Sequence, residues 1–262
     1  MLTVEKIGGT CMSQFPKVLK NVIGYPDSDK FSFKRVFVVS AYSGITDKLL
    51  GNKKTGKSGI YQYFVKGDNY NKKLDELLKD LKKINESFTD IKIDLEKANK
   101  FITNRIEHTK NYLESVDEIV ASGFVGKDKI YPAVYESLSS IGEAHSAFNT
   151  SNILKNNNIP SKFLDLTGFE DSRLLTIEER IKESFKGLDL SNKLIVVPGY
   201  TRGREGMLRK YGRGYSEITF SKIATYLDSR EAIIHKEYHL SSADPKIVGE
   251  KNIVPVGKTN YD

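Results

Sequence analysis

The sequence predicts an α/β fold, and three segments near the N-terminus carry that prediction. Residues 4–7, with the apolar Val4 and Ile7 at their ends, form a short segment that stops at a pair of glycines. Residues 15–23 repeat apolar side chains at helical spacing, and residues 36–39 are rich in β-branched side chains, as in strands buried on both faces. A strand, a turn, a helix and a second strand in this order are how an α/β fold begins.

A block of helices is expected next, with residues 49–128 as a helical layer or insert of one domain that spans residues 1–262. Its helices are indicated by apolar side chains that recur at spacings of three and four. The first carries Leu74, Leu77, Leu78, Leu81 and Ile84, the second carries Ile102, Ile106, Leu113, Val116 and Val120, and a third carries Val134, Leu138, Ile141 and Phe148.

Strand-like segments return after the helices, over residues 162–166, 194–197, 231–235 and 253–256. A helix over residues 217–227 lies between the second and third of these segments. This return to strands and helices in turn agrees with an α/β fold.

The composition suits a globular domain that needs no disulfide, because 39% of the residues are hydrophobic and the one cysteine is Cys11. A single cysteine suits a reducing cytoplasm, and no apolar run approaches the ~18 residues of a membrane span. The net charge is +7, but the lysines are spread along the chain between acidic residues. This distribution favours a small anion, such as a nucleotide phosphate, over a nucleic acid.

Lys6, Gly8 and Gly9 form the candidate phosphate site, because they stand where a strand ends and a helix begins. Glycines let backbone N–H groups approach phosphate oxygens, and a helix N-terminus adds partial positive charge. Lys6 can place its ammonium on a phosphoryl group that is being transferred. Taken alone, the motif also fits an ordinary strand-to-helix turn with a solvated lysine.

Residues 51–58 (GNKKTGKS) match the P-loop pattern, but their context argues against a P-loop. A P-loop needs a buried strand that runs into its first glycine and a helix that begins at its lysine. Here the preceding strand ends near Ser40, and no clear helix cap follows Ser58. We therefore expect residues 51–59 to form an exposed, basic loop.

Ser40, Gly44, Thr46 and Asp47 belong to a hydroxyl-rich loop that directly follows the second strand. Open α/β sheets bind ligands at the carboxyl ends of their strands, so this loop is a candidate binding segment. Thr46 or Asp47 is also suited to cap the helix that follows.

Glu143 and Arg213 are candidates for holding the two charged groups of an amino acid. Glu143 lies in an otherwise apolar or small helical stretch, where a carboxylate needs a cationic partner such as a bound ammonium. Arg213 lies between glycines and can offer two parallel hydrogen bonds to a carboxylate, and Ser216 either reaches the same ligand or caps a helix. A surface glutamate and a flexible basic loop are the plain alternatives, and nearby His145 is expected to be structural.

In this order and spacing, the motifs resemble those of the aspartokinases. They are Lys-x-Gly-Gly-Thr from Lys6, Ser-Ala-x-Ser-Gly-Ile-Thr-Asp from Ser40, Gly-Glu at Glu143, Gly-Arg-Gly-x-Ser around Arg213 and Ala-Asp-Pro at Asp244. The resemblance implies an amino-acid-kinase fold, a three-layer sandwich with a mostly parallel central sheet between helical layers. It also implies that ATP, with Mg²⁺, meets aspartate over the carboxyl ends of the strands.

The resemblance also assigns roles to single residues. The residues implied to be catalytic are Lys6, Gly8, Gly9 and Glu217. The residues implied to bind L-aspartate are Thr46, Asp47, Glu143, Arg213, Gly214 and Ser216. The residues implied to bind the nucleotide are Lys6, Gly8, Gly9, Ser40, Gly44, His235, Lys236, Ser241, Asp244 and Lys246. No residue is assigned as a metal ligand.

The chain departs from the aspartokinase pattern around its second half. Tyr215 stands where the family has glycine, and Glu217 replaces an aspartate, which keeps the charge and adds a methylene. Residues 234–236 replace the Trp-Thr-Asp of the nucleotide strand, and Ser241 replaces a tyrosine. These changes fall mainly on the side of the site that would hold adenine.

Two further features concern the branch of the family and its length. Residues 53–56 and 236–242 are similar to the aspartokinase branch found with ectoine biosynthesis. The family usually continues with a segment that supplies a nucleotide-site lysine and with ACT domains that bind lysine or threonine. We expect both to lie outside this chain, and the full-length enzyme to be a homo-oligomer, as a dimer.

The implied function is ATP-dependent phosphorylation of the aspartate side chain to 4-phospho-L-aspartate, the first step toward lysine, threonine and methionine, or toward ectoine. The β-carboxylate has a reference pKa of about 4, so it is ionised at neutral pH and needs no general base. Lys6, the glycine N–H groups and Mg²⁺ would supply positive charge. Two alternatives stay open: a related kinase acting on glutamate or acetylglutamate, and an inactive homologue that binds aspartate or nucleotide.

Overall fold

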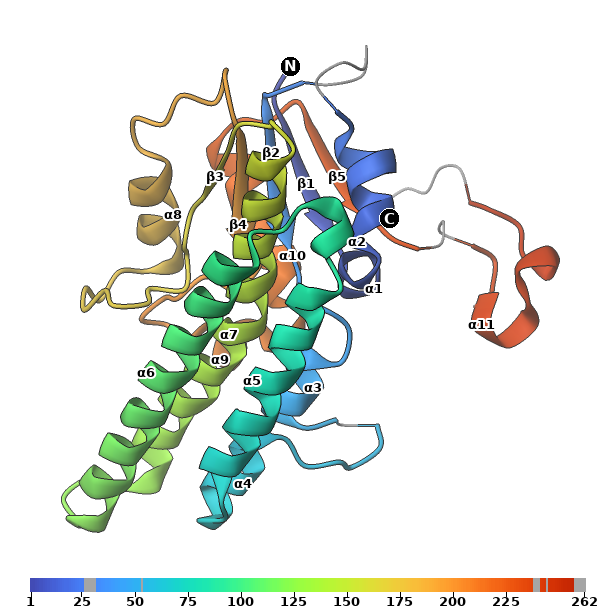
Figure 1. Ribbon diagram of the computed structural model, residues 1–262. Helices are drawn as coiled ribbons and strands as arrows, with labels where there is room; N and C mark the ends of the chain where they lie inside the picture. Colours follow the sequence, from blue (N-terminus) through green and yellow to red (C-terminus); the bar gives the residue numbers. More distant parts are fainter. Residues whose placement is uncertain (26–31, 53, 238–240, 244, 257–262) are drawn as a thin grey trace.

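A computed structural model describes residues 1–25, 32–52, 54–237, 241–243 and 245–256 (Figure 1). Its centre is a five-stranded sheet in the order β3-β4-β2-β1-β5, in which all neighbouring strands are parallel. The predicted α/β fold with a mostly parallel sheet is therefore confirmed. The strands are β1 (Thr3–Ile7), β2 (Arg35–Val39), β3 (Ser161–Phe163), β4 (Leu194–Pro198) and β5 (Glu231–His235).

The inner strands are apolar because both of their faces are covered. Every residue of β4 is buried, and β1 and β2 are exposed in part only at their first residue. In the register of the sheet, Ile7 pairs with Val39, and Val39 pairs with Pro198. The carboxyl ends of β1, β2 and β4 therefore lie at the same edge of the sheet, where open α/β sheets bind ligands.

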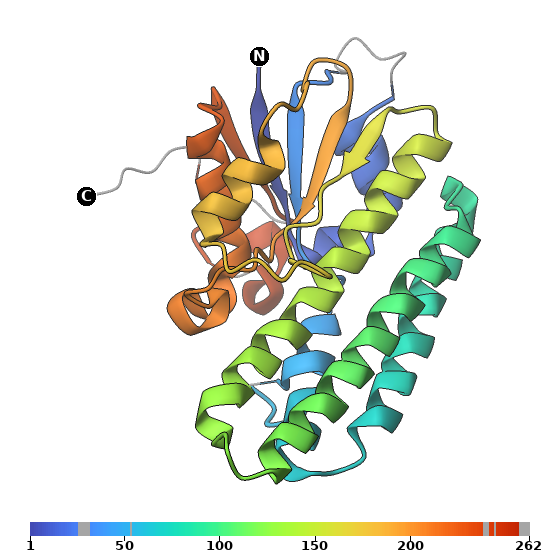
Figure 2. The same cartoon turned by 90° about the vertical axis from the view of Figure 1, so that its left-hand side faces the viewer.

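Helices cover both faces of the sheet, as Figures 1 and 2 show. One face is covered by α7 (Lys127–Asn156), which packs against β2, β3 and β4. The other face is covered by α10 (Tyr215–Tyr226), which packs against β1, β2 and β5 and is flanked by α8 (Ile177–Phe185). Together the sheet and these two layers form the sandwich that positions the site.

The first half of α7 extends beyond the sheet and joins a helical bundle (Figure 2). There it packs with α6 (Leu95–Ala121), which packs in turn with α5 (Tyr70–Glu86). Two shorter helices, α3 (Ile45–Leu50) and α4 (Ile60–Lys66), connect the bundle to β2. The predicted helices of this block are confirmed, and the third of them continues from the bundle onto the sheet.

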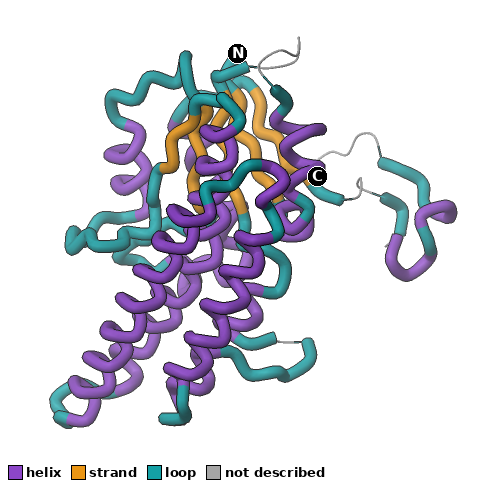
Figure 3. Tube along the Cα trace, in the orientation of Figure 1, coloured by secondary structure: helices purple, strands orange, loops and turns teal. Residues whose placement is uncertain are grey.

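Short elements complete the described chain, which Figure 3 colours by secondary structure. No helix in the described ranges is both long and apolar enough to cross a bilayer. The short elements are α1 (Gly9–Ser13), α2 (Phe15–Val18), the π-helix η1 (Leu19–Ile23), η2 (Thr89–Ile91), α9 (Met207–Tyr211), η3 (Gly212–Gly214), α11 (Pro245–Val248) and η4 (Glu250–Asn252).

The prediction of a strand over residues 253–256 was wrong. This segment makes an isolated antiparallel bridge, between Ser241 and Pro255, instead of adding a strand to the sheet. Val254 is 67% exposed, so β-branched side chains here gain no packed surface. β-Propensity describes the fit to a half-buried sheet, and it fails where no strand lies alongside. The strand predicted over residues 162–166 is also shorter, since β3 ends at Phe163.

The loop predicted over residues 51–59 is confirmed in its described part, but a helix does begin directly after it. Gly59 precedes α4, and its N–H donates to Oε1 of Gln62 at 2.7 Å. The Gln62 amide also donates to the carbonyl of Leu50 at 3.1 Å. Gln62 thus ties the start of α4 to the end of α3. The P-loop reading fails because α3, and not a strand, runs into Gly51.

Candidate functional site

A cavity of about 300 Å³ lies at the carboxyl ends of β1 and β2, between α7 and the start of α10. It brings together residues from segments far apart in the sequence, and most of them were predicted. The lining residues are Lys6, Gly9, Thr10, Ser40, Ala41, Tyr42, Ser43, Gly44, Thr46, Glu143, Arg213, Tyr215, Ser216 and Glu217.

Lys6 presents its ammonium to this cavity from β1. Its Nζ lies 2.6 Å from Oε1 of Glu217 in the first turn of α10. Lys6 is 4% exposed, whereas 44% of the Glu217 side chain is exposed. The cation therefore lies inside the cavity, with its direction set by a carboxylate at the rim.

Gly8 and Gly9 form the turn from β1 into α1. The N–H of Gly8 donates to the carbonyl of His235 at 3.3 Å, which joins this turn to the end of β5. A Cβ on Gly9 would lie 2.7 Å from the carbonyl oxygen of Ala41, a contact too close for any side chain. Gly9 is therefore required by the close approach of the loop that follows β2.

Glu143 enters the cavity from α7 and is completely buried. Its Oε1 accepts a hydrogen bond from the hydroxyl of Ser216 at 2.6 Å, and its Oε2 has no partner among the described residues. Burial raises the pKa of Glu143 to about 8, although the Ser216 hydroxyl and the charge of Lys6 act in the opposite direction. A buried carboxylate with one unused oxygen is a ready acceptor for a ligand ammonium.

Arg213 closes the cavity from η3. Its Nη1 donates to Oδ1 of Asp47 at 3.0 Å, and its Nη2 donates to the carbonyl oxygens of Gly51 and Leu50. Its Nε is buried without a partner in the described part of the chain. Asp47 and Arg213, both proposed from the sequence, thus form an ion pair, although Asp47 itself does not line the cavity. A ligand carboxylate would compete with Asp47 for the guanidinium.

Tyr215 was noted in the sequence only as a departure from a family pattern, yet it lines the cavity. It is fully buried, its hydroxyl is hydrogen-bonded to Thr46, and burial raises its pKa well above the usual value. Its ring packs edge-on against Tyr200, with centroids 5.8 Å apart. Of the other lining residues that were missed, Thr10, Ala41 and Ser43 lie inside the motifs themselves, and only Tyr42 required the packing to be known.

Tyr42 connects the cavity to a buried polar cluster at the junction with the bundle. Its hydroxyl accepts from the amide of Asn149 at 3.2 Å, and the same amide donates to Asn85 at 2.7 Å. His145 lies 2.7 Å from that Asn85 oxygen, and burial lowers its pKa to about 3. His145 therefore belongs to this internal cluster, which supports the structural role expected for it.

His235, predicted to bind nucleotide, turns its ring to Glu5. The two side chains are 2.8 Å apart, and Glu5 also accepts from Arg35 at 2.6 Å. Burial would raise the pKa of Glu5, but these hydrogen bonds outweigh it and lower the pKa to about 2. Arg35 also donates to the carbonyls of Val22 and Ile23, so this cluster lies between the sheet and η1. The His235 ring does not line the cavity, and its carbonyl accepts from the N–H of Gly8.

The other predicted nucleotide residues lie along the rim or beyond it. The side chain of Lys236 runs beside Gly8, 3.7 Å from where a Cβ would stand. Ser241 is placed by its bridge to Pro255, outside the lining of the cavity. Asp244 and the side chain of Lys246 lie outside the described residues.

The cavity contains basic and acidic side chains together. Lys6 and Arg213 are cationic, and Glu143 and Glu217 are acidic. Such an arrangement suits a zwitterion beside a phosphate better than it suits a bare metal ion. Within the described ranges, no group of three or more His, Cys, Asp and Glu side chains is placed to hold a metal ion.

The sequence of this chain is similar to that of known proteins over its whole length. The model of the amino acid kinase family matches residues 1–262. The chain is 43% identical over 265 residues to aspartate kinase Ask_Ect of Stutzerimonas stutzeri (strain A1501), which covers 100% of this chain and 56% of that protein. The chain thus spans about half the length of this relative.

Solved structures show the same fold. E. coli aspartokinase III in complex with aspartate and ADP (R-state) matches with a TM-score of 0.63 and 18% identity, over 98% of this chain and 53% of that one. The same enzyme in complex with lysine and aspartate (T-state) matches with a TM-score of 0.59 and 17% identity, over 97% and 53%. Because the family match runs over all 262 residues and the fold agrees with it, the chain belongs to the amino acid kinase family.

Proposed function

We propose that the protein transfers the γ-phosphoryl group of ATP to the β-carboxylate of L-aspartate, giving 4-phospho-L-aspartate. The observation that carries the proposal is the buried Glu143, whose Oε2 lacks a partner among the described residues, in one cavity with Lys6 and Arg213. An α-amino acid offers an ammonium to Glu143 and a carboxylate to Arg213. The 43% identity to an aspartate kinase supports aspartate as that amino acid.

In this proposal, the two α-groups of aspartate are held at opposite walls. Glu143 accepts the ammonium through its free oxygen, while Ser216 keeps its other oxygen in place. Arg213 receives the α-carboxylate and releases Asp47 in part or in full. Holding both α-groups leaves the β-carboxylate as the one acidic group free to react, which is how positioning lowers a barrier.

The nucleotide phosphates would lie over Gly8 and Gly9, with Lys6 against the group being transferred. The turn at Gly9 suits a phosphate for two reasons. Gly9 has no room for a side chain, and α1 begins there with N–H groups that are not paired within the helix. Lys236, beside Gly8, is placed to meet a phosphate from the other side. Mg²⁺ bound with the nucleotide would add positive charge near the phosphates.

The chemistry needs no general base. One β-carboxylate oxygen forms a bond to the γ-phosphorus, the bond from that phosphorus to the β–γ bridging oxygen breaks, and ADP leaves with the electron pair. No proton is transferred, because the carboxylate is already ionised at neutral pH. The site has to bring two anions together and to stabilise the charge of the transition state. Lys6 provides this charge stabilisation. A homodimeric full-length enzyme in the cytoplasm stays a prediction from the resemblance.

The proposal is tested by ADP release in a coupled assay with L-aspartate, L-glutamate and N-acetyl-L-glutamate as acceptors. We expect turnover with aspartate and less than about one hundredth of that rate with the other two, because a longer chain or a blocked ammonium misplaces the reacting carboxylate. Preference for another acceptor would assign a different amino acid kinase. Calorimetric titration with ATP tests for an inactive homologue, because tight binding without ADP release would indicate a protein that binds nucleotide without turnover.

A further inference from the structure

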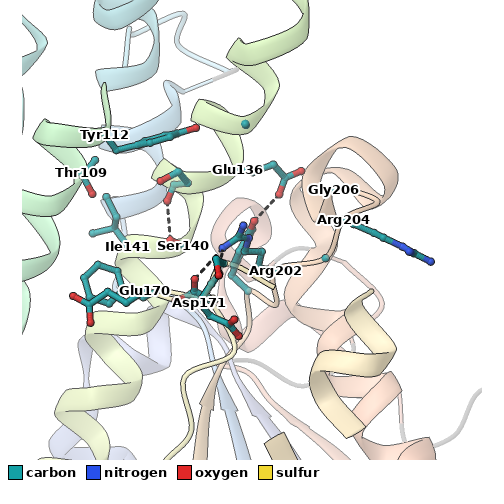
Figure 4. A pocket seen from close by; sticks show the side chains of 18 of the residues that line it. Thr109, Tyr112, Glu136, Ser140, Ile141, Glu170, Asp171, Arg202, Arg204 and Gly206 are labelled. Atoms are coloured by element: carbon teal, nitrogen blue, oxygen red, sulfur yellow. Dashed lines mark hydrogen bonds between the residues drawn. The ribbon is translucent and has the colours of Figure 1, made fainter. Parts of the chain in front are cut away.

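A second and larger cavity, of about 640 Å³, lies at the same edge of the sheet but over β3 and β4. It is enclosed by α6, by the first half of α7 and by the segments that follow β3 and β4 (Figure 4). None of its lining residues lines the smaller cavity that contains Lys6, Glu143 and Arg213. The rings of Tyr200 and Tyr215, packed edge-on, lie between the two spaces, and Tyr200 lines the larger one and Tyr215 the smaller.

One face of α6 forms the first wall. Arg105, Thr109 and Tyr112 recur there at spacings of four and three, so they lie on one side of the helix. Arg105 is buried and donates to Asp165 and Thr167, while its Nε has no partner among the described residues. Tyr112 is half-buried, and its hydroxyl has no hydrogen bond to any described residue.

The segment after β4 forms the opposite wall, and Arg202 is its principal side chain. The Nη1 of Arg202 donates to the carbonyl oxygens of Gly168 and Asp171, at 3.0 and 2.7 Å. A guanidinium has five N–H groups, so the three on Nε and Nη2 are left without an acceptor within the described part. Tyr112 and Arg202 line the same cavity from α6 and from the segment after β4, and the charge of Arg202 opposes the rise that burial causes in the pKa of Tyr112.

Two of the three acidic side chains of this cavity are, in contrast, already engaged, and the third, Glu170, is exposed. Glu136 accepts from the hydroxyl of Tyr200 at 2.8 Å and from the N–H groups of Leu208 and Arg209 at 2.7 and 3.1 Å. Asp171 accepts from Arg173 and Arg180. The acceptors of Glu136 and Asp171 are thus satisfied inside the protein, while donors of Arg202 and Tyr112 remain. The lining also carries more basic than acidic side chains, since Arg105, Lys129, Arg202, Arg204 and Arg209 stand against Glu136, Glu170 and Asp171. A site with spare donors and a basic lining selects an anion.

Apolar and aromatic side chains form part of the lining, among them Phe169, Ile141, Pro132 and the ring of Tyr200. The volume lies in the range of small-molecule sites, which are mostly apolar with a few placed polar groups. We propose that this cavity binds a small organic carboxylate with an aromatic body. The carboxylate lies between Arg202 and Tyr112, and the ring lies against Phe169 and Ile141.

The site is placed to influence the segment that carries Arg213. Tyr200 and Arg202 begin the segment that leads through α9 and η3 to Arg213, and Glu136 holds Tyr200 and the start of α9 together. A ligand on Arg202 therefore restrains residues 200–211. This effect can be measured as slower amide hydrogen exchange, without any need for turnover, so the inference can fail or succeed independently of the proposed kinase activity.

The test uses 2-naphthoate as the probe and 2-naphthamide as a neutral molecule of the same shape, both titrated by calorimetry. We expect one molecule of 2-naphthoate per chain, bound at least tenfold more tightly than the amide, with ATP and L-aspartate unable to displace it. Tyr112→Phe and Arg202→Gln should each weaken binding at least tenfold, since each removes donors to a charged group. Lys100→Gln, an exposed change on α6 outside the lining, should leave the affinity as in wild type.

Hydrogen exchange then locates the probe, and we expect slower exchange over residues 168–174 and 200–211. Tyr112→Phe removes only an oxygen, so it keeps the test valid if Arg202→Gln weakens the fold. Equal affinity for the amide, or wild-type affinity in both variants, would overturn the proposal. So would the absence of binding, or protection confined to residues 6–10 and 40–47, which would place the probe in the phosphate site.

Discussion

Nζ of Lys6 lies 2.6 Å from Oε1 of Glu217, although 211 positions separate them in the sequence. The ion pair joins the end of β1 to the first turn of α10 and holds the ammonium inside the cavity. Because 44% of the Glu217 side chain is exposed, the pair contributes little to stability, and its main effect is to orient the ammonium.

Lys6→Ala should lower kcat at least 100-fold while the affinity for aspartate changes less than about threefold, because a charge that acts on the transition state is removed. Stopped assays at saturating substrates and calorimetric titration with aspartate measure the two effects. Glu217→Gln should lower kcat less than Lys6→Ala does, since Lys6 keeps its charge in this variant. Lys48→Ala, which removes an exposed lysine paired with Asp80, serves as the control. Wild-type turnover in Lys6→Ala would remove Lys6 from the mechanism.

Arg213→Ala should raise the apparent KM for aspartate about 10- to 100-fold and change kcat less than tenfold, since the guanidinium binds a group that does not react. Asp47→Asn weakens the competing partner of Arg213 without removing its volume, so it should lower KM or leave it unchanged. Initial rates over a range of aspartate concentrations distinguish the two variants. If KM for aspartate is the same in Arg213→Ala and wild type, Arg213 does not hold the substrate.

Aspartate binding should strengthen as the pH rises from 6 toward 8. Burial raises the pKa of Glu143 to about 8, so below that pH the ligand-free carboxyl is mostly protonated, and binding an ammonium requires the proton to leave. Each pH unit below the pKa should therefore raise KM up to about tenfold. Glu143→Gln cannot ionise and should show a high KM that does not vary with pH. A wild-type KM that is equal at pH 6 and pH 8 would contradict the role of this carboxyl.

Gly9→Ala should destabilise the fold, whereas Gly8→Ala should not. A Cβ on Gly9 would lie 2.7 Å from the backbone oxygen of Ala41, but on Gly8 the nearest atom is 3.6 Å away, an ordinary contact. We expect a cost of about 1–3 kcal/mol for the first change, typical of overpacking, and an unchanged Tm for the second. Thermal unfolding of the two variants provides the comparison. Equal Tm values would show that the loop after β2 does not approach Gly9 this closely.

Much of the site could be predicted from the sequence because its segments are local motifs at strand ends. Each motif indicates a turn where a strand ends or a helix starts: Lys6 with its glycines, the loop from Ser40, and the glycines around Arg213. Parallel strands place such turns at one edge of the sheet, so these residues meet once the fold is α/β.

The pairings within the site could not be predicted, because they depend on packing between distant segments. Nothing local indicates that Asp47 meets Arg213, or that His235 turns to Glu5 instead of a ligand. The strand expected over residues 253–256 failed for the same reason, since a strand requires a neighbouring strand as well as β-branched residues. The larger cavity was also missed, because its walls come from α6, α7 and two loops that carry no common motif.

The most direct measurement is to trap the product with hydroxylamine in the presence of ATP and L-aspartate and to identify the hydroxamate by mass spectrometry against synthetic standards. An acyl phosphate on the side chain gives the β-hydroxamate of aspartate, whereas one on the α-carboxylate gives the α-isomer. The account predicts the β-isomer, formed in step with ADP and lost in Lys6→Ala. ADP released without hydroxamate, or the α-isomer as the product, would contradict it.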